Sequence, residues 1–141
     1  MYGTDATDSC EELDVIQAGG NYGWPDVGPF PFSDCYFGDQ VKAIHLFTRP
    51  DKTPGQFQSF VRVSGLEFVT AARYTALGDA LLTCEAETSE MRRVVVSGNQ
   101  VTSDDKVLGD CDGDITTSGD GTIYYSNATE IRRLLPGQTG G

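Results

Sequence analysis

The sequence is poor in positive charge and in histidine, and both shortages limit what the protein can do. It carries 10 Lys and Arg against 21 Asp and Glu, which gives a formal net charge of −11. Nucleic-acid binding needs Lys and Arg to displace the counterions of the phosphates, so we expect no nucleic-acid partner. With His45 as its one histidine, the chain has no Ser–His–Asp or Cys–His constellation, and nothing supports a hydrolase.

Long apolar stretches are also missing. No stretch approaches the roughly 20 apolar residues of a membrane-spanning helix, so we expect no membrane span. Residues 1–5 have no basic region followed by an apolar one, so we expect no signal peptide in this sequence. The protein is then either cytosolic or a piece of a longer precursor. Its 141 residues suffice for one domain with a real core.

The four cysteines lack the close spacing of a zinc site. No CxxC pair occurs and only one histidine is present, so a structural zinc site is not expected. Four cysteines allow three pairings, and we favour pairing between neighbours, Cys10–Cys35 and Cys84–Cys111. Their even number, with the glycosylation sequon at Asn127, favours an oxidising, extracytoplasmic setting.

What the chain does contain is a series of short apolar stretches separated by turn residues. No segment shows a sustained apolar period of 3.6 residues, so an all-β chain is predicted. The segments 97–100 and 118–121 have the chemistry of hairpin turns. The predicted strands are 2–4, 13–16, 43–47, 64–69, 80–84, 91–96, a short outer strand over 101–102 and 106–108, 114–117, 122–125 and 131–135.

An internal repeat organises these strands. Residues 90–95, Glu-Met-Arg-Arg-Val-Val, recur as Glu-Ile-Arg-Arg-Leu-Leu at 130–135, and residues 12–16 form a weaker third copy. A period near 40 residues with about four strands per unit is typical of a β-propeller blade. The alternative is a β-sandwich with coincidentally similar hairpins. Because propellers have 4–8 blades, the chain is too short to close a ring alone, and we expect a fragment or a subunit that closes by oligomerising.

The most distinctive stretch is residues 11–25, Glu-Glu-Leu-Asp-Val-Ile-Gln-Ala-Gly-Gly-Asn-Tyr-Gly-Trp-Pro. A short apolar strand with acids at its start runs into Gly19-Gly20-Asn21, which predicts a tight turn. Carboxylates before the turn and aromatic residues after it suit a hard cation or the floor of a pocket. The alternative is a structural corner in which Trp24 fills the core.

This stretch resembles the hallmark of the glucose/sorbosone dehydrogenase family, six-bladed propellers typified by soluble sugar dehydrogenases that use pyrroloquinoline quinone. The likeness continues through residues 64–68, 78–82 and 120–125, in the order of the family's C-terminal portion. The resemblance implies an all-β fold, a partial six-bladed β-propeller of about two and a half blades of four-stranded antiparallel sheets. The blade pieces would be about 1–61, 62–109 and 110–136, with 137–141 as a flexible tail.

The resemblance also implies a secreted or periplasmic protein with calcium near the turn. The carboxylate of Glu12, the backbone carbonyl of Tyr22 and, less directly, Glu11 would be its ligands, since oxygen ligands suit Ca²⁺. The backbone carbonyls around Ala6 and Thr7 would correspond to the loop that faces the quinone cofactor's own calcium.

Departures from the family concern the cofactor. The family's Arg-x-Arg-Asp run, whose arginines bind the anionic quinone, corresponds here to Cys111-Asp112-Gly113-Asp114, and a cofactor-facing lysine corresponds to Glu87. A tricarboxylate needs cationic partners. The family's catalytic histidine lies in its N-terminal half, and His45 does not match it. We therefore expect no catalytic residue in this chain and no sugar oxidation by it alone.

Two other charged patterns have simpler interpretations. Residues 110–114 resemble a calcium loop but lack the downstream Glu and the flanking helices of an EF-hand. Arg92-Arg93 and Arg132-Arg133 alternate faces along strands, and with Glu90 and Glu130 they are expected to form ion pairs between strands rather than an anion site.

Two functions follow as hypotheses, beside a third possibility in which the chain is simply a structural segment of a propeller. The first is a fragment of a sugar-dehydrogenase-like propeller, related to quinone-dependent oxidation of aldoses but without the cofactor-binding arginines. The second is a non-catalytic secreted propeller that binds carbohydrate, protein or calcium. In either case the expected partner is the rest of the propeller or a second copy, because an open propeller exposes strand edges and an apolar blade face.

Overall fold

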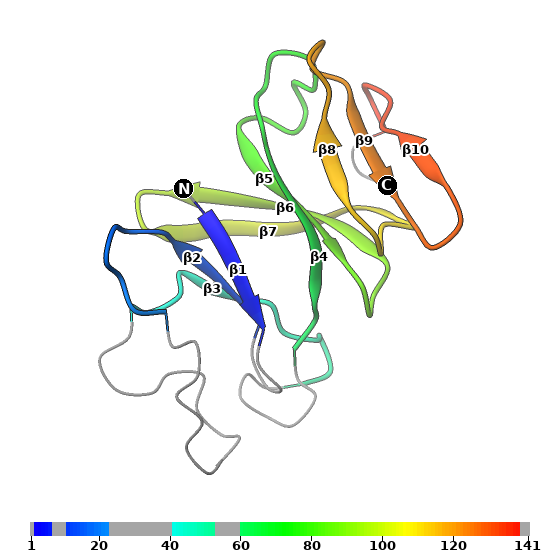
Figure 1. The fold of residues 1–141 in the computed structure, drawn as a ribbon. Helices are drawn as coiled ribbons and strands as arrows, with labels where there is room; N and C mark the ends of the chain where they lie inside the picture. Colours follow the sequence, from blue (N-terminus) through cyan, green and yellow to red (C-terminus); the bar gives the residue numbers. More distant parts are fainter. Residues whose placement is uncertain (1, 7–10, 23–40, 53–59, 139–141) are drawn as a thin grey trace. The chain divides into compact units, whose positions relative to one another are not determined.

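The computed structural model describes residues 2–6, 11–22, 41–52 and 60–138, which form two compact units, 1–62 and 63–141. The described residues contain strands and turns and no helix, as the sequence predicts (Figure 1). The predictions for Thr7, Cys10, Trp24 and Cys35 concern residues outside those that the structure describes.

The described residues of the first unit form an antiparallel sheet in the order β1-β2-β3. Its strands are β1 (Tyr2–Ala6), β2 (Glu11–Val15) and β3 (His45–Leu46). Pairing runs from Tyr2 opposite Val15 to Ala6 opposite Glu11, so β1 is longer than expected and includes Asp5 and Ala6 instead of ending before them. Pairing with the buried strand β2 continues through both residues, although Asp5 is polar.

The second unit begins with a four-stranded antiparallel meander in the order β4-β5-β6-β7. Its strands are β4 (Val63–Val69), β5 (Ala80–Glu85), β6 (Glu90–Ser97) and β7 (Gln100–Gly109). The hairpin between β6 and β7 turns at Gly98, whose φ of +62° suits glycine at the first central position of a type II′ turn. The outer strand β7 is longer and more continuous than predicted, because its polar middle, residues 103–106, pairs in register with β6 between two irregularities.

A three-stranded antiparallel sheet in the order β8-β9-β10 follows (Figure 1). Its strands are β8 (Ile115–Thr117), β9 (Ile123–Ser126) and β10 (Ile131–Arg133). Gly121 donates its amide to the carbonyl oxygen of Ser118 at 2.8 Å, which closes the predicted hairpin turn between β8 and β9. The strand β10 ends two residues earlier than the sequence predicts.

The core of the second unit lies between these two sheets. One face of the four-stranded sheet contributes Leu82, Cys84 and Met91, all fully buried. The three-stranded sheet contributes Ile115, Ile123 and Tyr125, and the segment after it contributes Leu134. A Cβ at Gly65 of β4 would lie 2.7 Å from the backbone nitrogen of Ile115, so glycine is what allows β4 and β8 to approach.

Candidate functional site

Three connections of the second unit meet at one end of its sheets: β5–β6, β7–β8 and β9–β10. The amide of Cys111 donates to the carbonyl oxygen of Ser89 at 3.2 Å, and that of Gly113 donates to Ser126 at 3.0 Å. These two bonds hold the β7–β8 connection between the other two. We call this region the acidic end; its members are Glu87, Asp110, Asp112, Asp114 and Glu130.

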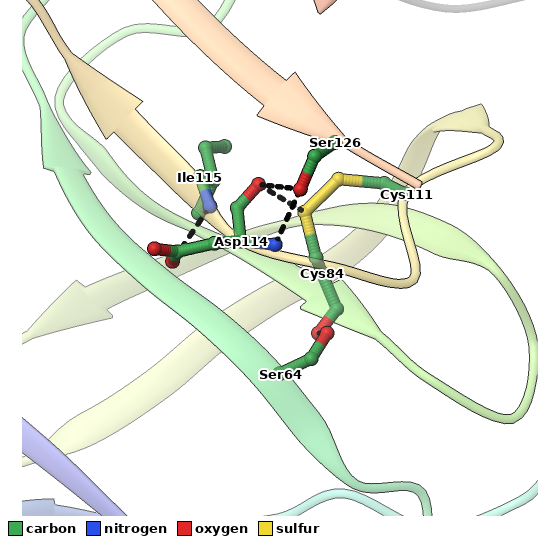
Figure 2. Close-up of a disulfide and its surroundings, with 6 residues drawn as sticks. All are labelled: Ser64, Cys84, Cys111, Asp114, Ile115 and Ser126. Atoms are coloured by element: carbon green, nitrogen blue, oxygen red, sulfur yellow. Dashed lines mark hydrogen bonds between the residues drawn. A yellow bond between two sulfur atoms is a disulfide. The ribbon is translucent and has the colours of Figure 1, made fainter. Parts of the chain in front are cut away.

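The β7–β8 connection is held rigidly at both ends. A disulfide joins Cys111 to Cys84 of β5, with Cα atoms 5.0 Å apart, which is the pairing that the sequence predicts. The amide of Asp114 donates to Ser126 Oγ at 2.9 Å, and the Asp114 carboxylate accepts the amide of Ile115 at 2.8 Å (Figure 2). A connection with this many backbone restraints is a fixed part of the fold.

Position 113 in this connection has no room for a side chain. A Cβ built on Gly113 would collide with the hydroxyl of Ser126 and would lie 3.1 Å from its carbonyl oxygen. Position 111 is equally committed, because its sulfur is bonded to Cys84 and its side chain is fully buried. Neither position presents a cationic side chain at this end of the unit.

Charges at the acidic end are arranged around Arg132. Its guanidinium lies 2.6 Å from the Asp110 carboxylate and 2.8 Å from that of Glu130. The hydrogen bond from Arg132 lowers the pKa of Glu130 and keeps it ionised. Asp112 Oδ1 is buried and accepts no hydrogen bond from the described part of the chain. The acidic end therefore remains negatively charged, because Arg132 pairs with only two of its carboxylates.

In the first unit, the predicted calcium ligands lie on β2 and on the turn that follows it. Glu11 and Glu12 are 3% and 5% exposed. The register places Glu11 opposite Ala6, so the structure brings together one predicted ligand and one residue of the predicted cofactor loop. Glu12 pairs with Asp5 on one side and with Leu46 on the other.

The predicted tight turn forms as expected. Gly20 donates its amide to the carbonyl oxygen of Gln17 at 3.1 Å, and Gly19 has a φ of +74°. The Tyr22 hydroxyl closes over the turn, accepts the amide of Gln17 and lies 3.2 Å from the carbonyl oxygen of Val15. A Cβ at Gly20 would collide with the Tyr22 ring, so this glycine is needed for the phenol to reach the strand.

The remaining candidates occupy ordinary positions. His45 lies on β3 and contacts Phe47 edge-to-face, with ring centroids 4.9 Å apart. Asn127 begins the β9–β10 turn, where its side-chain oxygen accepts the amides of Thr129 and Glu130. Within residues 2–6, 11–22, 41–52 and 60–138, no three His, Cys, Asp or Glu side chains gather closely enough to hold a metal ion.

A groove that the sequence did not indicate lies at the opposite end of the second unit. It has a volume of about 560 Å³ and lies between β4, the β4–β5 connection and the β8–β9 turn. Arg73 lies 3.3 Å from Asp120 across it, and Phe68 is exposed at its side. The 118–121 turn was recognisable in the sequence, but nothing in the spacing linked it to Arg73.

Repeated antiparallel sheets in an all-β chain, together with comparison to solved structures, define a partial β-propeller. The chain superposes on the structure described as "Crystal structure of glucose dehydrogenase" with a TM-score of 0.71 and 17% identity, over 95% of this chain and 40% of that one. A second structure, described as "glucose dehydrogenase", gives a TM-score of 0.67 and 20% identity, over 88% and 36%. The chain thus spans well under half of these proteins.

The sequence profile of the Glucose / Sorbosone dehydrogenase family matches residues 3–135. The chain therefore belongs to this family, as the motif at residues 11–25 predicts. No curated protein sequence gives a significant match. No helix in the described part of the chain is long and apolar enough to cross a membrane.

Proposed function

We propose that this chain is the C-terminal portion of a propeller related to quinone-dependent sugar dehydrogenases, and that its own loops do not hold the quinone. The observation that carries the proposal is the β7–β8 connection. Residues 111–114 stand where the family's Arg-x-Arg-Asp run is expected. Of the two arginine positions, one is Cys111, which is bonded to Cys84, and the other is Gly113, where a Cβ would collide with Ser126.

The residues at the acidic end do not fit pyrroloquinoline quinone. That cofactor is an anionic tricarboxylate, which needs cationic or amide donors. Here the connection offers Asp110, Asp112 and Asp114, and Arg132 is already bonded to two carboxylates. The carboxylates of the acidic end would repel the anionic quinone rather than bind it. The chemistry of the acidic end therefore differs from that of the family's cofactor site.

The predicted ligands in the first unit do fit a calcium ion. Glu12 is a buried carboxylate on a short strand, and the turn after it is fixed by Tyr22, so a backbone carbonyl next to the turn would be held in place. With no cluster of three acids among the described residues, a site of this kind relies on carbonyl oxygens for most of its ligands. We propose Glu12 and the Tyr22 carbonyl as ligands of a calcium ion that stabilises the turn, with Glu11 beside them.

The disulfide supports a secreted or periplasmic setting, since such bonds persist in oxidising compartments. Asn127 is a candidate for glycosylation in the same setting. Its turn is short and lies among exposed residues, which would leave the sequon accessible.

The second candidate function is quinone-dependent oxidation of an aldose by the complete propeller. The family match and the two glucose dehydrogenase structures favour it. It requires that polypeptide outside these residues supply the catalytic histidine and the cations that bind the quinone.

Calorimetric titration of Ca²⁺ and of pyrroloquinoline quinone into the longest natural form of the protein separates the two. We expect calcium binding without quinone binding, and weaker calcium binding in Glu12→Gln. Glu87→Gln, an exposed acid in a different connection, is the matched control and should bind calcium normally. Saturable quinone binding accompanied by dye reduction with an aldose would establish the second candidate, the dehydrogenase. The proposal itself would be overturned if substitutions within residues 110–114 abolished that quinone binding.

A further inference from the structure

The groove between β4, the β4–β5 connection and the β8–β9 turn takes no part in the function proposed above. Its walls belong to the second unit, and the connection and the turn lie at the same end of that unit (Figure 1). Its volume of about 560 Å³ is within the range of about 300–1,000 Å³ that is usual for small-molecule sites. The size of the groove therefore suits a small ligand, and its polar groups determine which one.

The cationic group of the groove is Arg73, which is held from one side. Its Nη1 donates to the Asp120 carboxylate at 3.3 Å and to the Asp120 carbonyl oxygen at 3.2 Å. That carboxylate also accepts hydrogen bonds from Ser118 and Thr122, which lower its pKa and keep it ionised. Within the described residues, Nε and Nη2 of Arg73 have no partner. The guanidinium therefore keeps the edge that binds a carboxylate through two parallel hydrogen bonds.

The carboxylate of Glu67 faces the same groove. Glu67 lies on β4 between Gly65 and Val69, and the three residues share one face because side chains alternate along a strand. Gly65 lies against the backbone of Ile115, and Val69 belongs to the core, so this face is turned toward the three-stranded sheet. Glu67 forms no hydrogen bond or ion pair with the rest of the described chain. It is therefore available to a positively charged group of a ligand.

The opposite wall contributes a hydroxyl without a hydrogen bond. Thr117 follows Ile115 by two positions on β8, so it faces β4. Its Oγ1 is buried and has no hydrogen-bond partner in the described part of the chain. Tyr74 does not supply one, because its hydroxyl donates to the carbonyl oxygen of Leu134 and accepts the amide of Ile123. Buried hydroxyls usually have a partner, and a bound ligand would provide it here.

We propose that the groove binds a small zwitterion, an α-amino acid with an apolar side chain. The carboxylate of the ligand pairs with Arg73, and its ammonium group pairs with Glu67 and the Thr117 hydroxyl. The side chain of the ligand lies on the apolar lining of the groove, which is formed by Val69, the Tyr74 ring and Ile123.

Ligands with one kind of charge fit the groove less well. An anion would pair with Arg73 but would be repelled by the carboxylate of Glu67. A metal ion would find one available carboxylate, since Asp120 already accepts hydrogen bonds from Arg73 and from its own turn. The groove lies at the end of the unit opposite the acidic end, so this inference and the proposed loss of quinone binding can fail separately.

The test is calorimetric titration of L-leucine and L-phenylalanine into the longest natural form of the protein. Two analogues of L-phenylalanine each lack one charge: 3-phenylpropanoate has no ammonium group, and phenethylamine has no carboxylate. We expect saturable binding of the amino acids. Each analogue should bind about 10-fold more weakly or worse, because it loses one charge-assisted hydrogen-bonded pair.

Variants locate the binding. Arg73→Met and Glu67→Gln each remove one charge of the groove and should weaken L-phenylalanine binding about 10-fold or more. Arg73→Lys keeps the charge but not the two-pronged edge, so its loss should be smaller. Arg133→Met and Glu87→Gln make the same changes outside the groove and should bind like the parent. The urea midpoint of each variant shows whether it is folded.

Absence of saturable binding of both amino acids would overturn the inference. Equal binding of 3-phenylpropanoate and L-phenylalanine would also overturn it, since the site would then recognise carboxylates alone. If L-phenylalanine bound equally well to the parent, to Arg73→Met and to Glu67→Gln, its site would lie elsewhere and the assignment to this groove would be wrong.

Discussion

The two sheets of the second unit are built from the same repeat and differ in how they are buried. Met91 in β6 is inaccessible to solvent, and Ile131 at the same repeat position in β10 is 77% exposed. Val94 and Leu134 lie three positions after Met91 and Ile131 in the repeat, where side chains alternate to the opposite face, and both are fully buried. The repeat therefore fixes which face each side chain takes, and neighbouring sheets decide whether that face is covered.

The arginines of the repeat differ in the same way. Arg92 lies 3.0 Å from Glu90, 2.6 Å from Asp104 and 3.6 Å from the buried Glu85. Arg132 reaches Glu130 and Asp110, whose side chains are 54% and 64% exposed. The ion pairs of Arg92, in the four-stranded sheet, are therefore partly buried, whereas those of Arg132 are exposed. Both arginines form ion pairs with carboxylates, as the sequence predicts, rather than an anion site.

The largest effect should come from truncating the repeat's apolar residue. Met91→Ala removes a buried side chain and should cost about 2–5 kcal/mol, because it leaves a cavity between the two sheets. Ile131→Ala should cost about 0.5 kcal/mol or less in residues 1–141. Urea unfolding of both variants measures the difference, and equal losses would contradict the assignment of an open face.

Removing the disulfide is the next largest change. The Cys84→Ala/Cys111→Ala double variant should lose about 3 kcal/mol, since the bond closes a loop between residues 27 positions apart. The loss should appear as a lower urea midpoint under oxidising conditions and vanish when both proteins are compared in reductant. An unchanged midpoint would mean that packing alone holds the β7–β8 connection.

The close approach of β4 and β8 can be tested with one methyl group. Gly65→Ala should cost about 1–3 kcal/mol, because the new Cβ meets backbone atoms of Asp114 and Ile115 that cannot easily move. Gly119→Ala is the control, since nothing lies within 4 Å of its Cβ position. Similar thermal midpoints for the two variants would show that the sheets are less tightly packed than described.

The two repeat arginines should also respond differently. Arg92→Met leaves the buried Glu85 without its cation and should cost about 1–3 kcal/mol. Arg132→Met breaks exposed pairs and should cost about 1 kcal/mol or less. Repeating the unfolding in high salt should reduce only the second loss, and salt sensitivity of both would place Arg92 at the surface.

The smallest expected effect is on pH dependence. Burial raises the pKa of Glu85 above its ordinary value of 4.5, so the folded state holds this proton more tightly than the unfolded state. Stability should fall as pH rises from about 4.5 through the raised pKa, and Glu85→Gln should flatten that part of the curve. The hydrogen bond from Lys106 lowers the pKa of Glu90, so its contribution is lost instead as pH falls below 4.5. A Glu85→Gln curve parallel to that of the parent would contradict the assignment.

Much of the fold was predictable because its signals are local. Gly19, Gly98 and Gly121 have the positive φ that their turns require. Strands could be predicted because their short apolar stretches are separated by such turn residues. The outer strand β7 was harder to predict, since its polar middle is held by pairing with β6 rather than by its own preference. Tertiary pairing is invisible to a local pattern.

The candidate site was predictable only in part. Residue types and resemblance singled out residues 111–114 and Glu12, whose roles stay predictions. Pairing of neighbouring cysteines predicted Cys84–Cys111, which the structure confirms. The collision of a side chain at position 113 with Ser126 depends on two segments that meet only in the folded chain. The same is true of the groove between Arg73 and Asp120, whose partners are 47 positions apart.

The bond between Cys84 and Cys111 also makes a covalent ring that contains the whole β6–β7 hairpin. The tip of that hairpin, around Gly98 and Asn99, is exposed. A protease that cut there would open the polypeptide without separating the pieces. The nicked protein would run as one band on a non-reducing gel and as two after reduction, with the sheets on both sides of the cut still attached.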